Sequence, residues 1–162
     1  MKYFFVMSAI AASFFIYSCG SDGNKSSPVI DSTDNSTSSS QTNDNPAYDP
    51  ERGKGKFTHV DVPEKLDVNM ASSGEKTFSV KCSGCHRLTD EKLVGPGWKG
   101  VTNRHKPEWI LNFITNTDEM IDKDPKVQAQ LELCLVRMPN QNLSDEAARA
   151  IYEFMRRNDG IK

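Results

Sequence analysis

The sequence predicts a small all-α domain, residues 67–162, that follows a long polar linker. Apolar residues at helical spacing, with capping residues beside them, recur in several segments between Ser72 and Asn158. The connection from Leu88 to Lys106 is rich in glycine and proline and shows no strand alternation. The chain has almost no large apolar side chains from Gly20 to Asn45 and few from Pro46 to Pro63. Together these patterns predict helices and loops without a sheet.

The N-terminus, residues 1–18, has the pattern of an export signal. Lys2 precedes an apolar run from Tyr3 to Tyr17, which is too short to span a bilayer comfortably. An uncleaved membrane anchor is the alternative. The run Ile-Tyr-Ser-Cys that ends at Cys19 resembles the lipobox of bacterial lipoproteins, which implies that Cys19 is lipidated after cleavage. We therefore expect a protein of the bacterial cell envelope, anchored to a membrane by lipid and facing the periplasm.

Residues 19–66 are expected to form a lipid-anchored flexible linker. Ser, Asn, Asp, Thr and Gly dominate from Gly20 to Asn45, so this stretch cannot bury enough apolar surface to offset the entropy of ordering. No regular structure is expected from Pro46 to Pro63 either. A flexible chain of this length has an end-to-end distance of roughly 35–40 Å, which lets an anchored domain reach its partners.

The first two helices are predicted on either side of the glycine-rich connection. One covers about 72–82, with Ser72 or Ser73 as its N-cap and Phe78 as its main apolar residue. The next covers about 107–116 and begins with proline at its first helical position. Its apolar face is formed by Trp109, Ile110, Phe113 and Ile114.

Two further helices complete the predicted domain. A helix over about 125–136 begins with Asp124 as its capping acid and a proline after it. The last helix covers 145–158, with Ser144 as its N-cap, acids in its first turn and arginines in its last. Those charges complement the helix dipole, and an apolar side that includes Ile151, Tyr152 and Met155 gives this helix a face to bury.

The motif Cys82-Ser83-Gly84-Cys85-His86 carries the chemistry of the chain. Thiols three positions apart suit addition to the two vinyl groups of one haem, and the adjacent His86 suits an axial iron ligand. A redox-active cysteine pair and a structural zinc site are the alternatives. The first expects a βαβ pattern and the second a further ligand pair, and neither is evident. The motif therefore predicts one covalent haem c. Cys134, left without a partner, is expected to be a small buried hydrophobe.

With these residues in place, the domain resembles the small single-haem class I cytochromes c, in a bacterial lipid-anchored form. The resemblance implies that Gly74 and Phe78 in the first helix cross the last helix, with Ile151, Tyr152 and Met155 as partners. It also implies that the carbonyl of Pro96, in the segment Leu-Val-Gly-Pro, accepts a hydrogen bond from Nδ1 of His86. Such a bond fixes the imidazole ring and raises its basicity as a ligand.

A methionine sulfur opposite the histidine is the second iron ligand that the resemblance implies. Met138 lies in a loop before the last helix, is followed by proline, and comes 52 positions after His86 (138 − 86). We expect Met138 to bind the iron, with Met120 as the next candidate. A His/Met pair raises the reduction potential of the haem.

Iron with ligands on both sides has no open position for a substrate, so we expect an electron carrier and no enzymatic activity. The predicted function is one-electron transfer between a redox protein donor and a respiratory reductase or oxidase, by a monomer. Residues 92–145 resemble lipid-anchored cytochromes that accompany nitrous oxide reductase, which implies that enzyme as a partner. A gas- or sulfide-binding sensor with a labile sixth site is the alternative, and a haem peroxidase or oxidase subunit is a third.

Charge is distributed unevenly along the domain. Basic residues outnumber acids from Lys76 to Lys106, around the haem motif, and acids outnumber bases from Pro107 to Ala148. This arrangement could orient an acidic partner toward the motif, although an ordinary solvated surface explains it equally well. The chain as a whole carries a formal net charge of −2, which gives no indication of nucleic-acid binding.

Overall fold

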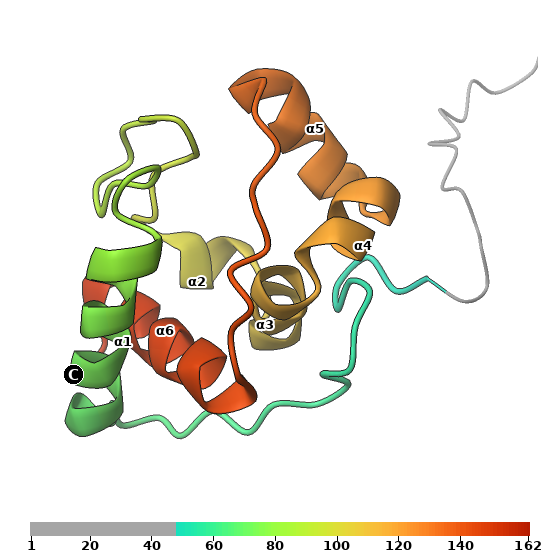
Figure 1. Cartoon of the computed structure of the whole chain (residues 1–162). Helices are drawn as coiled ribbons and strands as arrows, with labels where there is room; N and C mark the ends of the chain where they lie inside the picture. Colours follow the sequence, from blue (N-terminus) through green and yellow to red (C-terminus); the bar gives the residue numbers. More distant parts are fainter. Residues whose placement is uncertain (1–47) are drawn as a thin grey trace, which may run out of the picture. The chain divides into compact units, whose positions relative to one another are not determined.

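A computed structural model describes residues 48–162, and these residues form an all-helical fold without strands (Figure 1). The predicted signal peptide, Cys19 and most of the predicted linker lie outside the described residues. The predicted all-α class is confirmed. The helices are α1 (Val68–Lys81), α2 (Val101–Arg104), α3 (Pro107–Thr115), α4 (Thr117–Lys123), α5 (Pro125–Cys134) and α6 (Asp145–Asn158).

The crossing of α1 and α6 is the most extensive helix contact in the described part of the chain. Gly74 makes this approach possible, because a Cβ at that position would lie 2.0 Å from the carbonyl oxygen of Ala150. The ring of Phe78 packs on that of Phe154, with centroids 5.4 Å apart. Gly74 and Phe78 thus cross α6 as expected. Ala150 meets Gly74 and Phe154 meets Phe78, and the expected Ile151, Tyr152 and Met155 are buried on the same helix.

Capping residues set the helix ends, and two predicted ends were wrong. The first helix begins at Val68, not near Ser72, because the side chain of Asp67 accepts the backbone N–H of Met70 at 2.9 Å. The helix α5 ends at Cys134, two residues earlier than predicted, because Leu135 adopts a left-handed conformation. For α6 the prediction is confirmed, with Ser144 accepting the N–H of Ala147 at 3.2 Å.

Two short helices were not predicted. The four-residue α2 lies in the glycine-rich connection, and α4 lies between α3 and α5. Neither helix is long enough for its apolar residues to show a helical repeat in the sequence. In α4, Thr117, Met120 and Ile121 are buried while the acids face outward. This helix connects α3 to α5, and its Ile121 lines the site described below.

Residues 48–66, which we call the strap, lie against the helices although the sequence placed them in the linker. The side chain of Asn112 on α3 donates to the carbonyls of Arg52 (3.0 Å) and Phe57 (2.9 Å) and accepts the N–H of Phe57 (2.9 Å). The N–H of Val60 donates to Glu108 at 2.8 Å. In Figure 1 the strap passes beside α3 and below α6 before it enters α1.

Among residues 48–162, no helix combines the length and the apolar character that crossing a bilayer requires.

Candidate functional site

The cysteine-histidine motif forms a turn that continues directly from the end of α1. Cys82 caps that helix, and its carbonyl accepts the backbone N–H groups of Cys85 (3.0 Å) and His86 (2.9 Å). The Cys82 side chain is buried and that of Cys85 is exposed. Burial raises the pKa of the Cys82 thiol to about 11, so this thiol is protonated at neutral pH. Because residues 82–86 form one hydrogen-bonded turn, both thiols and the imidazole come from the same short segment.

The ring of His86 is fixed by the loop that follows it. Its Nδ1 donates to the Pro96 carbonyl at 2.8 Å, which is the predicted hydrogen bond. Burial lowers the pKa of His86, and the bond to Pro96 opposes that shift in part. A neutral imidazole with its proton on Nδ1 presents the lone pair of Nε2, the form that binds a metal ion.

Gly95 allows this loop to close over the histidine. The Val94 and Gly95 N–H groups both donate to the Cys85 carbonyl, at 3.2 and 2.9 Å. A Cβ at Gly95 would lie 2.4 Å from Cε1 of His86, so any side chain there would displace the ring or the loop. On another side of the imidazole, Trp98 is buried with its ring centroid 5.7 Å away. The orientation of His86 is therefore determined by packing as well as by its hydrogen bond.

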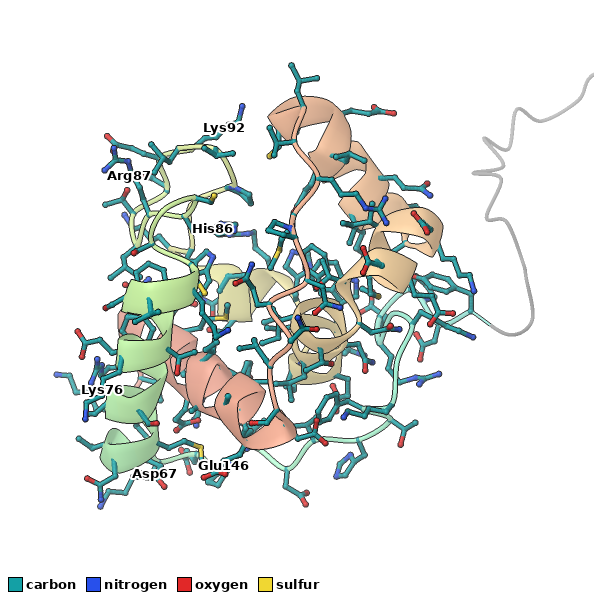
Figure 2. All side chains as sticks on the ribbon, in the orientation of Figure 1. Asp67, Lys76, His86, Arg87, Lys92 and Glu146 are labelled. Carbon is teal, nitrogen blue, oxygen red and sulfur yellow. The ribbon has the colours of Figure 1, made fainter. Side chains whose placement is uncertain are left out.

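An apolar cleft opens beside His86. Its empty space, counted together with the open solvent at its mouth, is about 570 Å³. One wall is formed by Cys85, His86 and residues 94–96, and the other by side chains of α3, α4 and α5 and the segment 136–139. In Figure 2, His86 points from its loop toward the chain that joins α5 to α6. The inner lining is aliphatic and aromatic: Phe113, Ile121, Val127 and Leu131.

Met138 lies on the wall of this cleft, as His86 does, and packs partly buried against the core. The residue before it, Arg137, fixes the segment to α4. Its guanidinium donates to Asp122 at 3.0 Å and to the carbonyl and carboxylate of Asp118 at 3.3 and 3.4 Å. The structure thus brings a thioether and an imidazole to one cavity from segments far apart in the sequence.

Met120, the second candidate ligand, is placed differently. It is 0% exposed, and its sulfur accepts the backbone N–H of Lys54 at 3.0 Å. A Cβ at Gly53 would lie 2.7 Å from the same sulfur, so the strap closes over it. Met120 is not among the residues that line the cleft. Its side chain serves the contact between strap and core.

Cys134 differs from its prediction. We expected a small buried hydrophobe, but this residue at the end of α5 is partly exposed and lines the cleft. The difference arises because α5 ends there and the chain turns toward the cleft mouth. A helical position at i+7 from Val127 predicted a core-facing side chain, and the early helix end was not evident from the sequence.

A buried carboxylate that sequence reasoning identified only as a helix cap organises the far wall. Asp124 is fully buried and accepts the N–H groups of Lys126 (2.8 Å) and Val127 (3.0 Å) at the start of α5. It also accepts Nε1 of Trp109 at 2.7 Å and the hydroxyl of Tyr48. Burial, followed by the hydrogen bond to Asp124, raises the pKa of Tyr48 well above its usual range. Asp124 therefore joins the strap, α3 and α5.

Comparisons with known proteins agree with this geometry. The family model described as cytochrome c matches residues 71–159. Among solved structures, a cytochrome c from Rhodothermus marinus is 35% identical, with a TM-score of 0.63 over 65% of this chain and 90% of that chain. An engineered form of the Rhodothermus marinus protein is 34% identical, with a TM-score of 0.62 over the same shares. The comparison with curated proteins gives no match.

Proposed function

The chain belongs to the cytochrome c family, and from this premise we propose an electron carrier in which His86 and Met138 bind the haem iron from opposite sides. Membership of the family establishes haem-based electron transfer and a covalently bound haem c. The ligand pair, the membrane attachment and the partners are the parts that we propose. Each of them is supported by particular residues, and each can be tested separately.

The residues of the cleft fit a haem c. Cys85 and His86 line the cleft and Cys82 lies on the same turn, so the two thiols would hold the macrocycle through thioethers and the imidazole would offer Nε2 to the iron. The aliphatic and aromatic lining suits a largely apolar ring and keeps water from its inner edge. When bound, haem c supplies an iron that cycles between Fe(III) and Fe(II). The protein holds and orients this group, through the covalent turn, the Pro96 carbonyl and the packing of Gly95 and Trp98 on His86.

The observation that carries the proposal is the presence of His86 and Met138 on the walls of one cleft. Of the two methionines considered as ligands, Met120 is enclosed in the core with its sulfur already hydrogen-bonded. A thioether on the iron stabilises the reduced state relative to a second nitrogen or an oxygen ligand, so a His/Met pair gives a carrier of relatively high potential. A filled sixth position also disfavours binding of substrates or gases.

The test compares ferric and ferrous absorption spectra of the wild type with those of Met138→Leu. Leucine conserves the side-chain volume and removes the sulfur. We expect this variant to lose the weak red band of a methionine–iron(III) bond and to bind carbon monoxide readily when reduced. Met120→Leu is the matched control, and it should retain the band. Identical spectra for wild type and Met138→Leu would show that Met138 only packs, and an open-site sensor would then be the better account.

The remaining parts of the proposal come from the N-terminal sequence. An export signal over residues 1–18 and lipidation of Cys19 support a carrier held at a membrane of the bacterial envelope and facing the periplasm. The donor and acceptor are then redox proteins of a respiratory chain. The resemblance of residues 92–145 to cytochromes that accompany nitrous oxide reductase supports that enzyme as the acceptor. Rapid oxidation of the reduced domain by purified nitrous oxide reductase, with nitrous oxide as the terminal oxidant, is the expected result, and no oxidation above the uncatalysed rate would exclude this partner.

A further inference from the structure

The segment that carries Met138 joins α5 to α6 and has no secondary structure of its own. It covers residues 135–144, and Figure 1 shows it as an extended trace from the end of α5 to the start of α6. Within residues 48–162, the backbone groups of residues 136–143 make no hydrogen bond to another backbone group. The position of this segment beside the cleft therefore depends on side chains.

Apolar packing holds the segment at few points. Most of residues 135–144 are exposed, and the apolar side chains that pack partly buried against the core are those of Met138 and Leu143. Near its far end, the carbonyl of Gln141 accepts Nζ of Lys81 at 3.0 Å. A segment that buries so little apolar surface can leave the core at a small cost in free energy. Its remaining contacts then decide how firmly it is held.

Arg137 makes the contacts that tie this segment to α4. Its guanidinium donates to the carboxylate of Asp122 at 3.0 Å, and to the carbonyl and carboxylate of Asp118 at 3.3 and 3.4 Å. The two acids are four positions apart on one helix, where like charges repel each other. A guanidinium that bridges both carboxylates removes this repulsion and adds charge-assisted hydrogen bonds. We call these three residues the Arg137 clamp.

The clamp acts on Met138 because Arg137 and Met138 share a peptide bond. A fixed guanidinium also fixes the backbone from which the thioether extends, and Arg137 lines the same cleft as Met138 and His86. The side chains of the clamp are exposed, at 46% for Arg137, 63% for Asp118 and 61% for Asp122. Dissolved salt screens ion pairs that are this exposed.

We propose that Arg137 is a positioning residue for the sixth iron ligand: through Asp118 and Asp122 it holds Met138 at the iron, and this hold weakens as ionic strength rises. The inference rests on the proposed function and identifies what controls its sixth ligand. When the clamp opens, the segment leaves the cleft and an external ligand can take the position of the thioether. The clamp thus sets the fraction of molecules in which the sixth position is open.

Imidazole binding to the ferric full-length holoprotein measures this open fraction, because the observed affinity is proportional to it. At mildly alkaline pH imidazole is mostly uncharged, so salt acts on the protein and not on the ligand. In the wild type we expect tighter binding at about 1 M than at about 10 mM sodium chloride, since the Debye length falls from about 30 Å to about 3 Å. Loss of the weak red methionine–iron(III) band follows the titration.

Three variants of the clamp separate its charges from its shape. At low salt, Arg137→Gln should bind imidazole about fivefold more tightly than the wild type, and its affinity should no longer depend on salt. The double variant Asp118→Asn with Asp122→Asn should behave in the same way. Arg137→Lys keeps the charge but loses the two-armed guanidinium, so it should retain a salt dependence and lie between Arg137→Gln and the wild type.

Lys123→Gln is the matched control, because Lys123 pairs with Glu119 on the same helix at 2.7 Å and does not line the cleft. It should keep the affinity and the salt dependence of the wild type. A wild-type affinity that is independent of salt would overturn the proposal, as would wild-type behaviour in Arg137→Gln or an equal effect of Lys123→Gln. If Arg137→Gln does not fold, the double variant and the wild type decide. A wild type without the red band would instead contradict the proposed function.

Discussion

Gly95 determines how closely the loop of residues 94–96 approaches the imidazole of His86. The absence of a side chain lets Pro96 reach Nδ1 of His86, and any Cβ would meet the ring at 2.4 Å. The resemblance to class I cytochromes predicted the Pro96 contact from a short sequence segment, because both partners lie within ten positions. The sequence did not show that Gly95 packs against the His86 ring and keeps it in place; the structure does.

A Gly95→Ala substitution should therefore disturb the iron site directly. We expect the added methyl group to tilt His86 or lengthen its bond to Pro96, which weakens the imidazole as a ligand and shifts the reduction potential. Redox titration of the purified holoprotein measures the shift. Gly84→Ala is the control, because a Cβ at Gly84 has no atom within 4 Å. Equal potentials in both variants and the wild type would show that the loop yields without affecting the histidine.

Asp124 illustrates what a sequence cannot provide at this scale. Its position before a proline predicts an N-cap, and the cap is present. Its bonds to Trp109 and Tyr48 come from residues 15 and 76 positions away, and no local pattern indicates them. The same limit applies to Met120, whose sulfur could be distinguished from that of Met138 only after the strap was seen to cover it.

At the scale of elements, the sequence predicts best the long helices that begin with a clear capping residue. The predicted bounds of α6 are confirmed, and the crossing with α1 through Gly74 follows from the family resemblance. The helices α2 and α4 were not predicted because each is too short to show a helical repeat of apolar residues. The early end of α5 depends on the left-handed conformation of Leu135. The packing of the strap on the helices was not predicted either, because the strap is polar like the linker before it. Mostly its backbone groups bond to the helices, and these are the same in any sequence.

The strap should contribute measurably to stability through Asn112. An Asn112→Ala substitution removes three hydrogen bonds to Arg52 and Phe57 and leaves partly buried backbone groups without these partners. We expect the free energy of unfolding to fall by about 2–4 kcal/mol. Guanidinium denaturation of the holoprotein, followed by tryptophan fluorescence, measures it. Ser79→Ala on the exposed side of α1 should change stability by less than about 0.5 kcal/mol. If both variants unfold alike, the strap adds nothing to the fold.

At the scale of the whole molecule, the proposed carrier has its haem domain joined to a membrane through a segment outside the described residues. The proposed attachment depends on Cys19 alone, so Cys19→Ser should release the carrier from the membrane to the soluble fraction with an unchanged haem spectrum. Fractionation followed by haem staining measures the distribution. Cys134→Ser is the matched control and should remain with the membrane. Retention of the Cys19→Ser protein in the membrane would indicate that the apolar run of the N-terminus is an uncleaved anchor.

The whole molecule also shows how composition and structure complement each other. The charge imbalance between residues 76–106 and 107–148 is compatible with an electrostatically guided partner and equally with an ordinary solvated surface, and the ion pairs of Arg137 with Asp118 and Asp122 lie within the acidic segment. Which charges neutralise one another depends on the fold, and the sequence alone could not supply this.

The central claim is that Met138 binds the iron opposite His86, and proton NMR of the ferrous holoprotein tests it most directly. A methionine methyl group held over the haem is shifted far upfield by the ring current, and methyl-labelled methionine identifies the signal. We predict one such resonance in the wild type and in Met120→Leu, and none in Met138→Leu. An upfield methionine signal that persists in Met138→Leu, or its absence from the wild type, would contradict the account.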